Sequence, residues 1–440
     1  MEGWQVEIDD RTAKGTAHRW SVGVLIADVL VGLALLTSFY VTGASVDSQP
    51  APYDLLMVAV ILLVIVLGLR LPRGLAWPAS LFGLVMVGMG IGGLSAVYVD
   101  KANNATMVLS YVIVTFIFFT CYVYEDPRRR LLLMFWCYTA AACAAALAGI
   151  AGYFGLTPGQ FVEYGRARGT FNDPNVYGPF LVAPTLFLAY RLSLAERLRD
   201  LWMAGPAAVL VLGLFLSFSR GAWGVFVLAC VVFFVLTAKT ARSRRQMVRL
   251  MGFAGFVTVL GTVVIGVALT IPEVSDLFVQ RFALVQDYDV TSQGGRFEGQ
   301  AKALEMTLRH PLGIGPSQWA MVNGLDTHNV YVHLLVAGGF LSGLAFIGLV
   351  FLTIWRGWSA SKRADPAQGL LIVAYAALVA QFAEGFIIDI QNWRHLYLLL
   401  GMVWGTILAT DVALAKRRRQ PKRFTQEIEV IPPQQPGFRI

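Results

Sequence analysis

Long apolar runs, separated by short polar or charged segments, make up most of this chain. A helix needs roughly 20 apolar residues to cross a bilayer, and runs of that order recur across most of the sequence. Apolar and polar residues do not alternate within the runs, which favours helices over the strands of a membrane barrel. The pattern predicts about twelve transmembrane helices, at 20–42, 52–69, 75–98, 105–124, 131–154, 174–191, 201–217, 221–238, 250–271, 328–353, 368–388 and 394–413.

Composition leads to the same fold class. The chain has 440 residues, of which 57% are hydrophobic and 14% charged, whereas a soluble domain has about 45–50% and 25%. Because the apolar residues are spread along the whole chain, a secreted protein with only a signal peptide is also excluded. The cysteines lack metal-ligand spacing and are expected to be buried thiols. We therefore predict an all-α polytopic membrane protein.

The placement of the charges predicts the topology. The net charge is +8, and most of the 35 Lys and Arg residues fall in alternate connecting segments. By the positive-inside rule these segments are cytoplasmic, as are both termini, and the charge does not imply a nucleic-acid partner. We expect a cytoplasmic tail at 1–19, a transmembrane domain at 20–413 and a basic, disordered tail at 414–440. The largest outer loop, 272–327, is expected to carry two amphipathic helices, at 275–285 and 296–310.

Three arginines on the predicted outer side each have a glycine close by. Arg168 lies in GRARGTFNDPN, Arg220 in SFSRGAW and Arg296 in SQGGRFEG. Glycine allows close backbone approach, and the guanidinium is a planar, permanently charged fork that suits phosphate. Converging forks would make a diphosphate site. For any one of them alone, the alternative is a structural or snorkelling arginine.

His328 is the candidate proton acceptor. It lies in DTHNVYVHLL at the predicted start of a span, where Asp326 or Asn329 could orient its ring. A neutral imidazole can accept a hydroxyl proton near pH 7. The alternative is that His328 caps the helix or packs at the interface. No metal site is predicted, because His328 and His333 point to different faces of a helix.

Other polar residues are weaker candidates. In GTFNDPN, Asn172 or Asp173 is expected to cap a helix that starts at Pro174, and its first amides, near Asn175, could cradle a phosphate. Asp28 and Glu384 are intramembrane acids, and such acids are functional candidates by default. The residues 313–315 (GIG) are not read as a nucleotide fingerprint, because no strand precedes them.

The order of the motifs RARGTFNDPN, SFSRGAW, QGGRFEG, HPLGIGPSQW and THNVYVHLLVAGGFLSG resembles that of the O-antigen ligase and polymerase family of bacterial envelope enzymes. The similarity is concentrated in residues 165–345. It implies a GT-C-like helical architecture and a glycan donor carried on undecaprenyl diphosphate. It also implies that Arg220 and Arg296 bind the diphosphate, that His328 assists the acceptor hydroxyl, and that no metal or other cofactor is needed.

The expected function is metal-independent, inverting glycosyl transfer at the periplasmic face of the inner membrane, with Arg168 assisting. The acceptor would be another glycan or a lipid A-core, and the length of the 272–327 loop favours a repeat-unit polymerase over a ligase. Membrane lipids and a chain-length regulator or flippase are the expected partners. The alternative is a multispan transporter or flippase for anionic lipid-linked saccharides, but no inverted repeat or broken helix is evident. A purely structural membrane scaffold explains the motifs least well.

Overall fold

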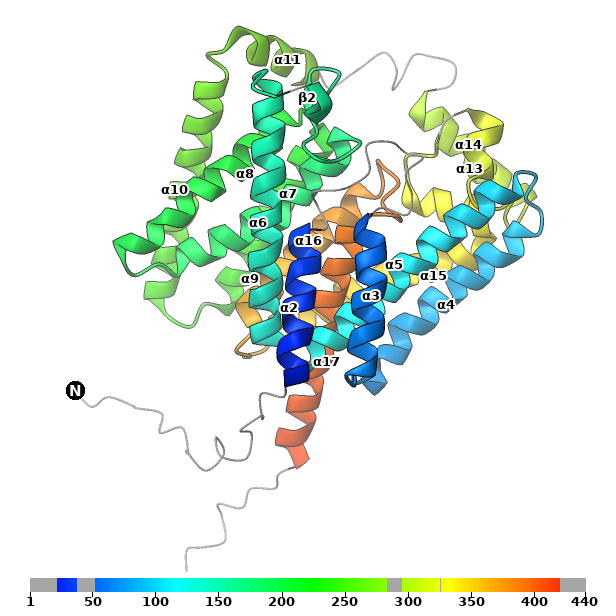
Figure 1. Ribbon diagram of the computed structural model, residues 1–440, viewed down its shortest axis with the longest axis horizontal. Helices are drawn as coiled ribbons and strands as arrows, with labels where there is room; N and C mark the ends of the chain where they lie inside the picture. Colours follow the sequence, from blue (N-terminus) through cyan, green and yellow to red (C-terminus); the bar gives the residue numbers. More distant parts are fainter. Residues whose placement is uncertain (1–21, 38–51, 158, 283–294, 325, 420–440) are drawn as a thin grey trace, which may run out of the picture.

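The computed structural model describes residues 22–37, 52–157, 159–282, 295–324 and 326–419, and it is built almost entirely of helices (Figure 1). The predicted tail at 1–19, most of that at 414–440 and part of the loop at 272–327 lie outside these ranges. The helices are α2 (Val22–Thr37), α3 (Pro52–Val66), α4 (Ala76–Gly93), α5 (Val99–Glu125), α6 (Pro127–Tyr153), α7 (Pro174–Ser193), α8 (Ala204–Leu216), α9 (Arg220–Thr240), α10 (Arg244–Ala268), α11 (Pro272–Phe282), α13 (Arg296–Arg309), α14 (Gln318–Asn323), α15 (Val330–Ser361), α16 (Gln368–Glu384) and α17 (Arg394–Arg419).

Short elements connect the long helices. The 3-10 helices are η2 (Arg73–Leu75), η3 (Gly159–Phe161) and η4 (Leu198–Met203). Between α6 and α7, strands β1 (Val162–Glu163) and β2 (Arg166–Ala167) pair antiparallel as a small hairpin.

Every range predicted from the hydrophobic pattern overlaps one of the long helices. Within the described residues, 7 helices are long and apolar enough to cross a membrane, or up to 8 if the pair Gly261–Ala268 and Pro272–Val279, bent by 106°, counts as one span. Shorter apolar helices lie within α2, α3 and α16. These observations confirm an all-α, multi-pass membrane protein, and the figure of twelve crossings stays a prediction.

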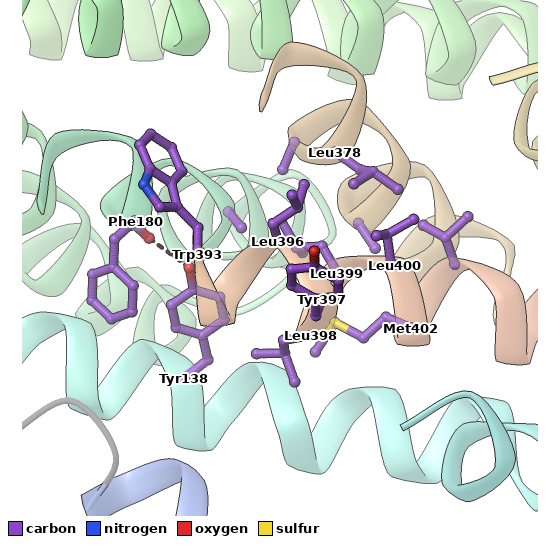
Figure 2. Packing of buried hydrophobic residues seen from close by; sticks show 14 of the residues in the cluster. Tyr138, Phe180, Leu378, Trp393, Leu396, Tyr397, Leu398, Leu399, Leu400 and Met402 are labelled. Carbon is purple, nitrogen blue, oxygen red and sulfur yellow. Dashed lines mark hydrogen bonds between the residues drawn. The ribbon is translucent and has the colours of Figure 1, made fainter. Parts of the chain in front are cut away.

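Helices α16 and α17 lie in the middle of the bundle and form much of its core. Figure 2 shows Leu378 of α16 near the buried side chains of α17, with Trp393 beside Tyr138 and Phe180. The Tyr138 hydroxyl donates to the Phe180 carbonyl at 2.8 Å, which ties α6 to α7. Because so many large side chains are buried here, both helices that flank the α16–α17 connection are closely packed in the core.

Helix α15 is broken near its first third. Gly338 has φ −117° and ψ 16°, and Gly339 has φ 68° and ψ −169°, so the helical path is interrupted at both residues. The positive φ at residue 339 favours glycine, and a Cβ there would also lie 2.3 Å from the Pro311 carbonyl oxygen. This break was not expected from the sequence, in which the residues 328–353 form one continuous apolar run.

A segment from the preceding loop fills the break. The N–H of Phe340 donates to the Pro311 carbonyl at 3.0 Å instead of to Val336, and the carbonyls of Val336 and Ala337 accept from the N–H groups of Ile314 and Gly315 at 2.9 and 3.0 Å. The GIG sequence is therefore a backbone insert in a broken helix. The interruption leaves these carbonyls satisfied, as backbone at membrane depth requires.

Candidate functional site

The candidate site surrounds residues 384–389, at the C-terminal end of α16 and the start of the segment that leads to α17. Contacts to these residues come from the start of α9, the start of α13 and the turn before α15. These three elements carry the residues that the sequence singled out, Arg220, Arg296 and His328.

Arg220 is the first residue of α9. Ser219 caps this helix by accepting a backbone N–H at 3.3 Å. A Cβ on Gly221 would lie 3.0 Å from Glu384 Oε1 and 3.2 Å from Ile387 Cδ1, so the first turn of α9 packs directly against the end of α16 and the residues that follow it. Arg220 therefore projects from a helix N-terminus, whose dipole favours anions.

Arg296 is the first residue of α13, directly after the N-cap Gly295. Its Nη1 donates to the Ile387 carbonyl at 3.3 Å. The side chain of the same Ile387 faces Gly221 of α9. The helix starts that carry Arg220 and Arg296, which are remote in sequence, therefore meet at one residue.

His328 does not begin α15, which corrects the expectation from the sequence. The helix starts at Val330, and Asn329 is its N-cap, with Oδ1 accepting from the N–H groups of Tyr331 and Val332 at 3.1 and 3.2 Å. The amide oxygen of Asn329 is therefore a helix cap and does not orient the imidazole. His328 lies in the preceding turn with a left-handed φ of 48°, which is uncommon for a residue with a side chain.

Asp389 holds this turn, although no motif in the sequence pointed to it. Its Oδ1 accepts from Thr327 Oγ1 and Asn329 N, each at 2.9 Å, and its Oδ2 accepts from His328 N at 3.0 Å. On the other side, Gln300 of α13 donates through Nε2 to the His328 carbonyl at 3.3 Å. An acid in the short connection before the last span was the available signal, but only the fold brings it to His328.

One group in the described part of the chain could hold a metal ion. Asp326, His333 and Asp389 offer ligand atoms that all lie within 4.8 Å of one another. Asp326 is exposed, and both oxygens of Asp389 already accept hydrogen bonds from the turn. Asp326 thus lies close to His333 and Asp389, an arrangement that the spacing of the histidines did not predict.

The arginines of the β hairpin have structural contacts. Arg168 donates through Nε and Nη1 to two backbone carbonyls of its own loop, at 3.2 and 3.3 Å. The buried Arg166 donates through Nη2 to Asn175 Oδ1 at 2.7 Å and through Nε to the Ser217 carbonyl at 2.9 Å. Arg166, which was not among the arginines predicted from the sequence, therefore links the start of α7 to the turn before α9.

The predicted cap of α7 is confirmed. Asp173 is the N-cap, with Oδ1 accepting from Asn175 N at 2.7 Å, and Pro174 occupies the first helical position. Asn175 thus has both its backbone N–H and its side-chain oxygen engaged, and it supports the hairpin and the α8–α9 turn.

The two acids that the sequence places in or near the membrane, Asp28 and Glu384, have different surroundings. Glu384, only 3% exposed, lies against the start of α9, and its Oε2 has no hydrogen-bond partner among the described residues. Asp28 accepts from the Tyr122 hydroxyl at 2.6 Å and pairs with Arg129 and Arg130, so it has the partner set that the sequence did not reveal. Asp28 is therefore a structural acid joining α2 to α5 and α6, and Glu384 remains with the site.

This arrangement suits the binding of an anion next to a proton acceptor. Arg220 and Arg296 are the first residues of two helices that meet at Ile387. The helix dipoles and the permanent charges of the two guanidinium groups both favour a negative ligand there. The His328 turn is fixed to the same connecting segment through Asp389. In such a place a hydroxyl group could lose its proton beside a bound phosphate ester.

The middle of the chain is similar to a known protein family. A family model described as O-Antigen ligase matches residues 205–347, a segment that includes Arg220, Arg296 and His328. The resemblance indicated by the motifs is therefore confirmed. No curated protein matches the chain.

Proposed function

We propose, from the place of this multi-pass membrane protein in the O-antigen ligase and polymerase family, that it transfers a glycan from undecaprenyl diphosphate to an acceptor at the periplasmic face of the inner membrane. The acceptor is a glycan chain or a lipid A-core, and the reaction inverts the anomeric centre without a metal. The architecture is GT-C-like, with the membrane domain at 20–413.

The observation that carries this proposal is the convergence on residues 384–389. Arg220, Arg296 and His328 come from three separate elements, and each element contacts this short segment. The three residues lie far apart in the sequence, and the elements that carry them come together at this one segment.

The proposed chemistry follows from the charges. The acceptor hydroxyl attacks the anomeric carbon on the face opposite the diphosphate, and the imidazole of His328 takes its proton. The bond between that carbon and the diphosphate oxygen breaks, and the electron pair leaves with the diphosphate. Arg220 and Arg296 stabilise the charge that develops on this leaving group, where preorganised donors have their largest effect.

Residues around these three hold their positions. Asp389 and Asn329 support the His328 turn, and Asn175 supports the start of α9 through Arg166. Arg168 has two of its donors engaged with its own loop, so we assign it an assisting role at the rim.

The decisive test is His328→Asn. Asparagine tolerates a left-handed φ, so the turn is kept while the base is removed. We expect turnover to fall about 10² to 10⁴ fold, with the affinity for the lipid-linked donor nearly unchanged. Donor binding and single-turnover transfer are measured separately on purified protein. His310→Asn, at the exposed end of α13, is the matched control and should have full activity.

A chelator tests whether Asp326, His333 and Asp389 hold a metal ion that transfer requires. If Asp326, His333 and Asp389 bind no essential metal, transfer continues undiminished in EDTA. Loss of transfer in EDTA, with recovery on adding a divalent ion, contradicts the metal-independent reaction.

Full turnover of His328→Asn would show that His328 is not the base, and only the roles of the arginines would then remain in the proposal.

The break in α15 is the observation that favours a transporter, since transporters often use broken helices at their substrate sites. The carbonyls of Val336 and Ala337 at this break already accept hydrogen bonds from residues 314 and 315, so a segment of this chain occupies the break. Reconstituted protein that moves a fluorescent lipid-linked sugar across the bilayer without transferring it would support this second function.

A further inference from the structure

Two adjoining cavities lie far from the candidate site, where the α3–α4 connection meets α17. Figure 1 shows the C-terminal end of α17 and the start of α2 at one end of the bundle, and α11, α13 and α14 at the other. The cavities measure about 790 and 650 Å³, and both are lined by Arg70, Tyr124 and Val412. They therefore form one continuous recess on this part of the surface.

The wall of the recess is a fixed structure. Gly68 turns the chain after α3 with φ +100°, a conformation that favours glycine. A Cβ on Gly74 would lie 2.5 Å from Leu408 Cδ2, so the connection packs tightly against α17. Leu75 is buried beside it. The residues from 69 to 73 are therefore held in place beside the recess by fixed points on either side.

The acids in the lining are already neutralised by arginines. Asp411 pairs with Arg356 and, at 2.6 Å, with Arg363. Glu125 pairs with Arg130 at 2.8 Å. The carboxylates of Asp411 and Glu125 therefore leave the other basic side chains of the recess available to a ligand.

Three further cations surround the recess. The side chains of Arg70, Arg73 and Lys416 are exposed, and none of them has a hydrogen bond or ion pair with another described residue. The recess therefore carries excess positive charge in groups that remain available, and guanidinium forks are suited to phosphate.

Large apolar side chains stand beside these cations. Val66 is 81%, Leu71 72% and Trp77 71% exposed, and the last two line the recess with Arg70 and Arg73. Because Trp77 lies at the start of a candidate membrane span, these side chains face acyl chains, and a phospholipid whose headgroup lies at the cations would contact them with its own chains. Aromatic and basic residues of this kind are typical of the interfacial region of a bilayer.

We propose that the recess binds the headgroup of an anionic phospholipid. Arg70, Arg73 and Lys416 contact its phosphate and glycerol oxygens, and Leu71 and Trp77 contact the first part of its acyl chains. This site is separate from the proposed transfer site and does not depend on that function.

The test is lipid binding to the detergent-purified, full-length protein by native mass spectrometry. Phosphatidylglycerol should bind more tightly than phosphatidylcholine with the same acyl chains. Each basic residue near an anionic surface contributes about 1 kcal/mol, so Arg70→Gln with Arg73→Gln should weaken phosphatidylglycerol binding about 25-fold. Arg197→Gln with Arg199→Gln removes the same charge from the α7–α8 connection, outside the recess, and should have little effect.

Further arms settle the nature of the ligand. Trp77→Ala, which changes no charge, should also lower phosphatidylglycerol affinity, and it decides the question if the double variant does not fold. Unchanged binding in folded Arg70→Gln, Arg73→Gln protein overturns the proposal. Displacement of the lipid by millimolar inorganic phosphate, with no loss in Trp77→Ala, identifies a soluble phosphate site instead and also overturns it.

Discussion

The Asp389→Asn substitution probes how the His328 turn is held. One carboxylate accepts three hydrogen bonds in this structure, two on Oδ1 and one on Oδ2 from His328 N. An asparagine can keep the bonds from Thr327 and Asn329 through its oxygen. Its NH₂ group, however, would then face the N–H of His328, so a charge-assisted hydrogen bond is replaced by two opposed donors.

The size of the effect follows from this lost bond. A hydrogen bond to a charged group contributes about 1.5–3 kcal/mol. His328 also adopts φ 48°, which costs a non-glycine residue roughly 1–2 kcal/mol and is maintained only while its surroundings hold it. If the loss of 1.5–3 kcal/mol falls entirely on the placement of the imidazole, turnover should decrease about 10- to 150-fold, at 1.4 kcal/mol per factor of ten.

The assay separates this effect from a loss of donor binding. Single-turnover transfer and donor affinity are measured on purified Asp389→Asn, and we expect the rate to fall while the affinity is kept, since Arg220 and Arg296 are unchanged. Asp365→Asn is the matched control, because Asp365 also accepts a backbone N–H, from Ala367 at 2.8 Å, but before α16 at the other end of that helix. A normal rate in Asp389→Asn, or equal losses of rate and affinity, would refute the reasoning.

Three other predictions follow from the same structure. Arg296→Lys should impair transfer nearly as much as Arg296→Ala, because an ammonium group cannot form the bidentate contact, and a fully active lysine variant in the transfer assay would contradict this. Gly339→Ala should destabilise the protein by at least about 1–2 kcal/mol in thermal unfolding, because alanine would have to adopt a left-handed φ and its Cβ would clash with a carbonyl oxygen. Gly83→Ala is the control and should be neutral or stabilising, because the space around its Cβ is open. A cysteine at Asn323 should react with a membrane-impermeant thiol reagent outside sealed cells and one at Ser243 should not; the opposite pattern would invert the topology.

Local features of the sequence predicted the helices and several of their ends. Asp173 and Pro174 identified a helix start, and apolar runs of sufficient length identified the helices of the bundle, because these properties depend only on neighbouring residues. The glycines beside Arg220 and Arg296 indicated close backbone approach, and the structure adds that both residues begin helices that lie against residues 384–387.

Features that depend on contacts between distant residues were not predicted. Asp389 binds backbone groups at positions 328 and 329, and no local pattern links that acid to His328. The break at Gly338 and Gly339 likewise depends on a segment that precedes α15, since a glycine pair within an apolar run is also compatible with an unbroken helix. The position of His328 outside the helix follows from the hydrogen bonds that Asp389 accepts from the N–H groups of His328 and Asn329.

The filled break in α15 limits how the outer loop can move. Residues 314 and 315 donate their N–H groups to carbonyls of α15, so the stretch of the loop between α13 and α14 is anchored. Pulling this anchor out would leave buried backbone groups without partners, at a cost of several kcal/mol for each group in a lipid environment. Detachment of this part of the loop from α15 therefore requires that these hydrogen bonds break. In hydrogen–deuterium exchange, the amides of Ile314 and Gly315 should exchange as slowly as those of the central helices.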